Sequence, residues 1–150
     1  MTHPALIKPA EELRDFLRGR VSVGMPDGTT ETVTVYSDWE RPTNGLPEDF
    51  LVIYLNGDME GVGSDINFAK GYIAVGLYCK MNDDGSVKNN RIQNILVQFD
   101  TLIEKLITAN YHFEYAMPQF ITPTTPNQTS GYSSTVLSLR WHTNNNFNTE

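Results

Sequence analysis

The sequence predicts an α+β fold: a mostly antiparallel sheet with one long amphipathic helix and a short N-terminal helix packed on one face. Apolar residues recur at helical spacing along residues 87–109, and they alternate with other residues along 71–81. Strands interrupted by one main helix are typical of α+β domains. A chain of 150 residues corresponds to one domain. We expect its core at about 9–142 and a polar, disordered tail at 143–150.

The first predicted element is a short helix over residues 9–18. Pro9 suits the first helical position, where its missing N–H leaves no hydrogen bond unmade. Gly19 supplies a stop signal at the C-terminal end. Between these two signals an apolar stripe at helical spacing predicts one buried face, formed by Leu13, Phe16 and Leu17.

A hairpin, two loops and a central strand are predicted next. Residues 21–36 contain two β-branched runs around the turn Pro26-Asp27-Gly28, which favours a β-hairpin. Residues 37–49 are rich in turn residues and predict a connecting loop. The continuous apolar run over 50–55 indicates a buried strand. Three glycines within residues 57–69 predict a second loop.

Residues 71–81 form the clearest strand pattern. One face is apolar throughout and should contact the core. The other face mixes small, aromatic and charged residues, which predicts a surface that is partly hydrated or contacts another subunit. Cys79 lies on the apolar face, so we expect a buried structural residue rather than a nucleophile.

The C-terminal half begins with the main helix, which should run from a cap at Ser86 to about Ala109. A strand follows over residues 111–117. Residues 118–131 are rich in Pro and Thr and carry no charge, which predicts a long loop. A final strand is expected over residues 132–142.

Composition excludes several functions. The net charge of -7 and the pI near 4.9 argue against sequence-specific nucleic-acid binding and against binding to a membrane surface. No apolar stretch is long enough for a transmembrane helix, and the N-terminus lacks the pattern of a signal peptide. The single cysteine cannot form an internal disulfide.

A search for chemical motifs predicts no enzyme, no cofactor and no metal site. The three histidines lack ligand spacing, although His112 and His142 lie on strands that could be adjacent. Asp58, Glu60 and Asp65 form an acidic cluster that does not match a calcium loop. Such clusters are usually solvated, so catalysis by these carboxylates is the weaker interpretation. No phosphate-binding, dinucleotide-binding or Gly-x-Ser-x-Gly motif is present.

The predicted loop over 118–131 is the best candidate for an interface. Its prolines favour extended conformations, which lowers the entropy lost on binding. We therefore interpret it as an arm that contacts a neighbouring subunit, against the alternative of a solvated loop. The candidate contact residues are Phe120, Ile121, Thr125, Gln128 and Tyr132.

The layout of the chain resembles that of phage tail terminator and tail completion proteins. These are small α+β domains that begin with a short helix ending near a Leu-x-Gly segment, matched here by Leu17-Arg18-Gly19-Arg20-Val21. A proline then precedes a buried strand, as in residues 46–54. The strand at 71–81 and the helix at 87–109 follow in the same order. The resemblance covers residues 9–142.

The resemblance implies a structural protein of the virion, assembled in the cytoplasm of a bacterial host. Such proteins form a ring, often a hexamer, that caps the tail tube and joins it to the head. The implied partners are other copies of the chain, tail tube proteins and head-completion proteins. Asp58, Glu60 and Asp65 would then face the lumen or the tube, where like charge lets DNA slide. The alternatives are another virion joint, in head closure or the baseplate, or a hydrolytic or small-ligand-binding domain that uses residues 58–65.

Overall fold

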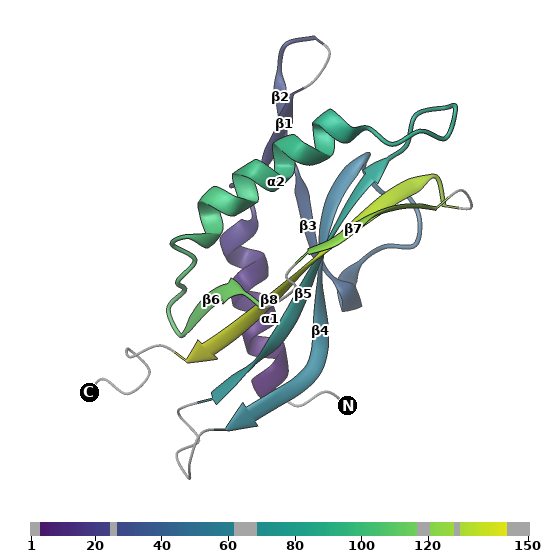
Figure 1. Ribbon diagram of the computed structural model, residues 1–150. Helices are drawn as coiled ribbons and strands as arrows, with labels where there is room; N and C mark the ends of the chain where they lie inside the picture. The colour runs from purple at the N-terminus through teal and green to yellow at the C-terminus, as the bar shows by residue number, and fades with distance from the viewer. Residues whose placement is uncertain (1–3, 25–26, 62–68, 117–120, 128–129, 144–150) are drawn as a thin grey trace.

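The computed structural model describes residues 4–24, 27–61, 69–116, 121–127 and 130–143 (Figure 1). Its elements are α1 (Pro4–Leu17), β1 (Ser22–Gly24), β2 (Thr30–Thr32), β3 (Thr34–Ser37), a 3-10 turn η1 (Asp38–Glu40), β4 (Asp49–Gly61), β5 (Ala69–Lys80), α2 (Asn89–Ile103), β6 (Tyr111–Tyr115), β7 (Ile121–Asn127) and β8 (Tyr132–Thr143). The predicted α+β class is confirmed.

The main sheet has six strands in the order β3-β4-β5-β8-β6, and β7 also pairs with β8. All of these pairs are antiparallel except β3 with β4. The predicted hairpin forms as β1 and β2, which make a separate two-stranded sheet. β3 continues directly from this hairpin and carries the chain into the main sheet.

Both helices pack on one face of the main sheet, as predicted (Figure 1). α1 contacts β3 and β4, whereas α2 contacts β5, β6 and the hairpin strand β1. The predicted apolar face of β5 is buried against the helices. The largest fully buried side chains of the core come from both layers and include Leu13, Leu17, Leu51, Ile53, Ile73, Leu77, Ile95, Phe99, Phe113 and Leu137.

The helix boundaries differ from the prediction. α1 begins at Pro4, so Pro9 lies inside the helix rather than at its first position. Pro4 offers the same favourable start, whereas Pro9 lies beyond the first turn, where a proline removes one helical hydrogen bond and its ring crowds the carbonyl of Ala5. α2 is shorter than predicted at both ends. Ser86 does not cap it, because its hydroxyl and its backbone N–H both donate to Asp84 Oδ1 in a preceding turn.

Two predicted loops contain strands. The prediction of a loop over 57–69 is wrong at both ends of that range, since β4 extends to Gly61 and β5 begins at Ala69. The loop predicted over 118–131 is wrong for 121–127, which form β7 and pair with β8. β6 pairs with residues 139–143 of β8 and β7 pairs with 132–137, so the two strands share one edge. Residues 144–150 of the predicted tail lie outside the described residues.

The sheet face away from the helices is partly covered by aromatic side chains. Phe50 is buried there, stacked on Tyr78 with a centroid distance of 5.0 Å and in edge contact with Tyr132. The Tyr132 hydroxyl donates to the carbonyl of Pro47 at 2.8 Å, which fastens the loop before β4 to this face. Gly76 lies under this layer. A Cβ at Gly76 would lie 2.9 Å from ring carbons of both Tyr54 and Tyr78.

Candidate functional site

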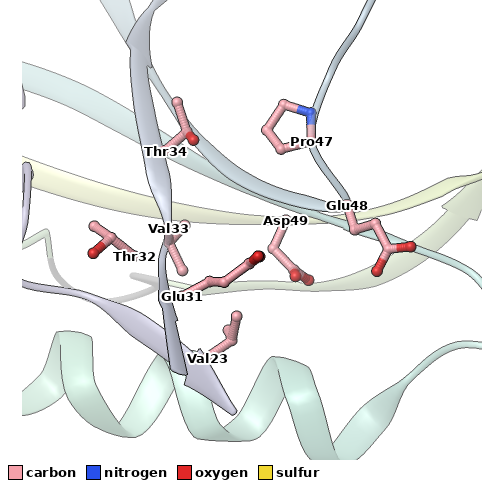
Figure 2. Close-up of a pocket in the computed structure, with 8 residues that line it drawn as sticks. All are labelled: Val23, Glu31, Thr32, Val33, Thr34, Pro47, Glu48 and Asp49. Carbon is pink, nitrogen blue, oxygen red and sulfur yellow. The ribbon is translucent and has the colours of Figure 1, made fainter. Parts of the chain in front are cut away.

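A pocket of about 550 Å³ lies between the β1–β2 hairpin, β3 and the residues that begin β4 (Figure 2). Its lining residues are Val23, Glu31, Thr32, Val33, Thr34, Pro47, Glu48 and Asp49. Three of the eight are carboxylates, and none of these described lining residues is basic. The pocket therefore combines a small apolar base with a strongly negative wall.

Asp49 is the buried carboxylate of this pocket. It is the first residue of β4 and lies opposite Cys79 of β5, so its side chain emerges at the end of the core face. The side chain is 4% exposed, and one oxygen, Oδ2, accepts a hydrogen bond from Arg91 Nε at 2.7 Å. This hydrogen bond raises the pKa of Arg91. The other oxygen, Oδ1, is buried, and the Cys79 thiol is a further hydrogen-bond neighbour of this carboxylate.

The other two carboxylates lie on exposed parts of the wall. Glu31 is directly opposite Val23 in the hairpin, and cross-strand partners project from the same face of a pair. Since Val23 is buried toward the core, Glu31 is directed into the pocket (Figure 2). Glu48 precedes Asp49, and its carbonyl accepts a hydrogen bond from the backbone N–H of Lys80 at 2.7 Å. The segment is thus held in place by β5.

Cys79 is buried, as predicted. Burial, reinforced by the negative charge of Asp49, raises the pKa of its thiol. A thiol with a raised pKa is protonated at neutral pH and is a poor nucleophile. Cys79 is therefore a core residue beside the pocket.

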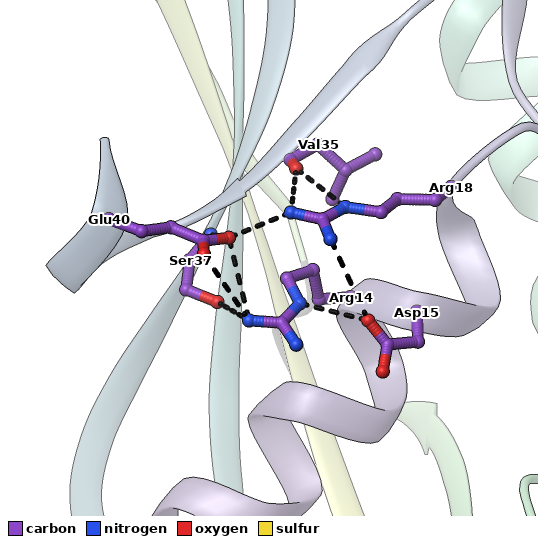
Figure 3. A network of polar contacts seen from close by, with 6 residues as sticks. All are labelled: Arg14, Asp15, Arg18, Val35, Ser37 and Glu40. Atoms are coloured by element: carbon purple, nitrogen blue, oxygen red, sulfur yellow. Dashed lines mark hydrogen bonds and ion pairs between the residues drawn. The ribbon is translucent and has the colours of Figure 1, made fainter. Parts of the chain in front are cut away.

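A second polar cluster joins α1 to the segment that follows β3 (Figure 3). Arg18 Nη2 donates to Glu40 Oε1 at 2.8 Å and to the carbonyl of Val35 at 3.1 Å. Arg14 Nη1 donates to the hydroxyl of the buried Ser37 at 3.0 Å. Glu40 in turn accepts from the backbone N–H of Ser37 at 3.0 Å. Each side chain of this cluster has at least one partner within the chain, so its role is structural.

This cluster makes stability depend on pH. The backbone N–H of Ser37, with Arg14 and Arg18, lowers the pKa of Glu40 below its ordinary value of 4.5. A carboxylate whose pKa is lower in the folded state stabilises the protein at pH values above its unfolded-state pKa. This contribution is lost as the pH falls through its folded-state pKa. Glu40→Gln should therefore lower the free energy of unfolding by about 1 kcal/mol at pH 7, since solvent screens these ion pairs. The deficit should shrink in denaturant titrations below pH 4.5.

Glu104→Gln is the matched control for this experiment, because Glu104 is an exposed carboxylate at the end of α2. Its stability should follow that of the wild type across the same pH range. A constant difference between Glu40→Gln and the wild type from pH 7 to pH 3 would contradict the assignment.

The two histidines that could be adjacent do meet. His112 and His142 are cross-strand partners in β6 and β8, and their ring centroids lie 4.9 Å apart in an edge-to-face arrangement. The next pair on the same face of these strands is an ion pair, in which Arg140 Nε contacts Glu114 Oε1 at 2.7 Å. Both pairs lie on the strand surface and support the pairing of β6 with β8.

The predicted site residues are only partly placed. Asp58 and Glu60 lie in the extension of β4, where Glu60 pairs with Lys70 in backbone register, and their side chains lie outside the described residues. Asp65 also lies outside them. The predicted loop over 57–69 therefore does not hold these carboxylates as one flexible cluster, because two of them are in a strand.

The predicted interface residues are also only partly placed by the structure. Phe120 and Gln128 lie outside the described residues. Ile121 and Thr125 are strand residues of β7, paired in register with Leu137 and Ser134, and their side chains are not described. Tyr132 contacts its own chain at Phe50 and Pro47. Residues 121–127 of the predicted arm thus form an edge strand of their own sheet, and their contact with a neighbouring subunit stays a prediction.

Sequence reasoning missed the pocket residues Glu31, Glu48 and Asp49. The available signal was Asp49, a charged residue immediately before a continuous apolar run. A charge at the start of a buried strand requires a buried partner. That partner, Arg91, is 42 positions away on α2.

The chemistry open to the pocket is recognition of positive charge. Within the described part of the chain, no three His, Cys, Asp or Glu side chains are grouped closely enough to hold a metal ion. Neither of the described helices is long and apolar enough to cross a membrane.

Together the fold and the pocket define a two-layer α+β domain with one open sheet face, a projecting hairpin and an acidic recess at the base of that hairpin. The sequence matches no protein-family model and no curated protein.

Proposed function

We propose that this chain is a structural protein of a phage or prophage virion that assembles into a ring, as a tail terminator that caps the tail tube and joins it to the head. The supporting observation is the β1–β2 hairpin, which projects beyond the main sheet at one end of the molecule (Figure 1). The core holds the base of the hairpin, because Val23 of β1 is buried and β1 contacts α2. The outer strand β2 is exposed throughout, which leaves it available for a contact with another molecule.

The hairpin offers an open edge for that contact. All three residues of β2 are exposed, and β1 is the only described strand that pairs with it. The backbone N–H of Val33 donates to the carbonyl of Val21, and hydrogen-bonded pairs alternate along an antiparallel ladder. The N–H of Thr30 therefore points away from β1. An outward row of unpaired donors and acceptors is a template for another strand or segment.

The arrangement also suits a head-to-tail ring. The paired ends of β4 and β5 lie at the end of the molecule opposite the hairpin (Figure 1). A closed ring requires two different patches on each copy, one of which meets the other on the next copy. Two projecting features at opposite ends supply such patches. Tail tube and head-completion proteins would then contact the faces of the ring, and the chain would act in assembly rather than catalysis.

The test is the mass of the purified chain by light scattering on a size-exclusion column over a range of concentrations, with negative-stain images of the largest species. We expect a closed ring. Thr30→Pro removes the outward N–H without breaking a bond to β1, so it should shift the protein to monomers, whereas Thr30→Ala should keep the ring. A wild-type chain that is monomeric at every concentration would contradict the proposal. A ring that survives Thr30→Pro would exclude the β2 edge from the contact.

A further inference from the structure

Two imidazole rings meet on the sheet face away from the helices, near the C-terminal end of β8. His112 and His142 are direct cross-strand partners, and their ring centroids lie 4.9 Å apart. The next residue of β6, Phe113, and its partner Trp141 are buried in the core, so the two histidines project from the opposite face, where both are partly exposed. Imidazole is a preferred ligand of several transition-metal ions, which makes this pair a candidate metal site.

The separation of the two rings matches that of two histidines on one zinc ion. A Zn–N bond is about 2.0–2.1 Å long, so a coordinated ring has its centroid about 3.2 Å from the ion, and two such rings at the tetrahedral angle have centroids about 5.2 Å apart. The observed distance is 4.9 Å, with the rings edge to face at 77°. The χ2 torsion of histidine is broad, and rotation about it turns a ring while hardly moving its centroid. This rotation directs a nitrogen of His112 toward His142 without a change in the backbone.

A backbone contact sets the tautomer of His142. Its Nδ1 lies 3.0 Å from the carbonyl oxygen of Thr143. A carbonyl oxygen only accepts, so Nδ1 carries the proton and donates it, which leaves the lone pair of the neutral ring on Nε2. Metal-binding histidines have this arrangement, in which one ring nitrogen binds the ion and the other donates to a carbonyl or carboxylate. The contact is independent of the ring distance, and it prepares Nε2 of His142 to bind a cation.

The neighbouring charges define a site with two protein ligands. Glu114 is next on the same face, but its carboxylate is held by Arg140 at 2.7 Å. Lys70 of β5 is the partner of His142 on the other side of β8, and its positive charge limits the affinity for a cation. Among the described residues, no third His, Cys, Asp or Glu joins the two histidines. A tetrahedral zinc ion has four positions, so two remain for water or for a donor from another molecule.

We propose that His112 and His142 together bind one divalent transition-metal ion of the kind that prefers imidazole, with Zn²⁺ as the representative species. The ion joins β6 to β8 through both side chains and stabilises this edge of the sheet. The inference goes beyond the proposed role in virion assembly and does not depend on it.

The first measurement is calorimetric titration of the full chain, without a histidine tag, with zinc chloride at neutral pH and with magnesium chloride as the salt control. We expect one Zn²⁺ per chain and no binding of Mg²⁺, which prefers oxygen ligands. His112→Gln and His142→Gln should each weaken Zn²⁺ binding by at least about tenfold, because one of the two protein ligands is lost. The matched control is His3→Gln, which makes the same substitution at the remaining histidine of the chain, outside the described residues. It should bind like the wild type.

The second measurement follows the ring nitrogens of the wild type by NMR spectroscopy during the same titration, so it does not depend on the folding of a variant. Zn²⁺ should shift Nε2 of His142 in a saturable manner and leave Nδ1 protonated, since Nδ1 donates to Thr143. A ring nitrogen of His112 should shift in step with it. Zn²⁺ should also raise the Tm of the wild type and of His3→Gln, because an ion that binds only the folded state adds stability.

Several outcomes would overturn the proposal. A wild type that binds no Zn²⁺ excludes the site. Equal affinities in the wild type, His112→Gln and His142→Gln, or an equal loss in His3→Gln, would show that Zn²⁺ binds elsewhere on the chain. A shift at only one of the two rings would exclude a shared ion. None of these results bears on ring assembly, which light scattering measures separately in buffer that contains a chelator.

Discussion

Replacing Arg91 with methionine should lower the free energy of unfolding by about 3–5 kcal/mol, because the change leaves a buried carboxylate without its counter-charge. The Asp49 side chain is 4% exposed, and Arg91 donates to its Oδ2. Removing one member of a buried pair leaves the desolvation penalty of the other uncompensated. Denaturant titration of the two proteins at pH 7 measures the difference.

A double variant distinguishes a lost ion pair from lost packing. In Asp49→Leu/Arg91→Met both charges are replaced by apolar groups, which is often neutral for a buried pair. We expect it to recover most of the stability lost in Arg91→Met. If the double variant is as unstable as Arg91→Met alone, the aliphatic part of Arg91 rather than its charge supports the fold.

Replacing Phe99 with alanine should also lower the free energy of unfolding by about 3–5 kcal/mol, through the cavity that it leaves in the core. Phe99 is 1% exposed in the middle of α2, and its ring centroid lies 6.3 Å from that of Tyr115 on β6. The side chain therefore fills the space where the main helix meets the sheet. Thermal and denaturant unfolding of the variant measure the effect.

Val97 provides the control on the same helix, because it is 64% exposed. Val97→Ala removes an apolar side chain without leaving a cavity, so it should change stability by no more than about 0.5 kcal/mol. Equal losses in Phe99→Ala and Val97→Ala would contradict the described packing of α2. They would show instead that both residues act through helix propensity.

The elements in which apolar residues recur at a regular spacing were predictable from the sequence. The alternation in β5 and the helical spacing in α2 both come from burial on one face, which leaves a local pattern in the sequence. β7 was missed because its prolines resemble loop residues. A strand at the edge of a sheet tolerates proline where the missing N–H would have pointed outward, and Pro126 pairs with Ser133 at such an edge.

The pocket could not be predicted in the same way. Glu31 and Asp49 come together only because β3 pairs in parallel with β4 after the hairpin has turned back over the core. The periodic pattern of residues within one segment does not show which other segment, joined to it by a loop, it pairs with in parallel. Asp49 itself was a visible anomaly, but its partner Arg91 depends on how α2 lies across the sheet.

The order of strands has a consequence for synthesis. β8 lies between β5 on one side and β6 and β7 on the other, yet it follows all of them in the sequence. Until residues 132–143 have left the ribosome, the edges of β5, β6 and β7 that face β8 remain open, and open edges of this kind promote aggregation. These edges are covered only when β8 pairs with them. Completion of the sheet therefore comes at the end of synthesis, since β8 is the last strand of the chain to be made.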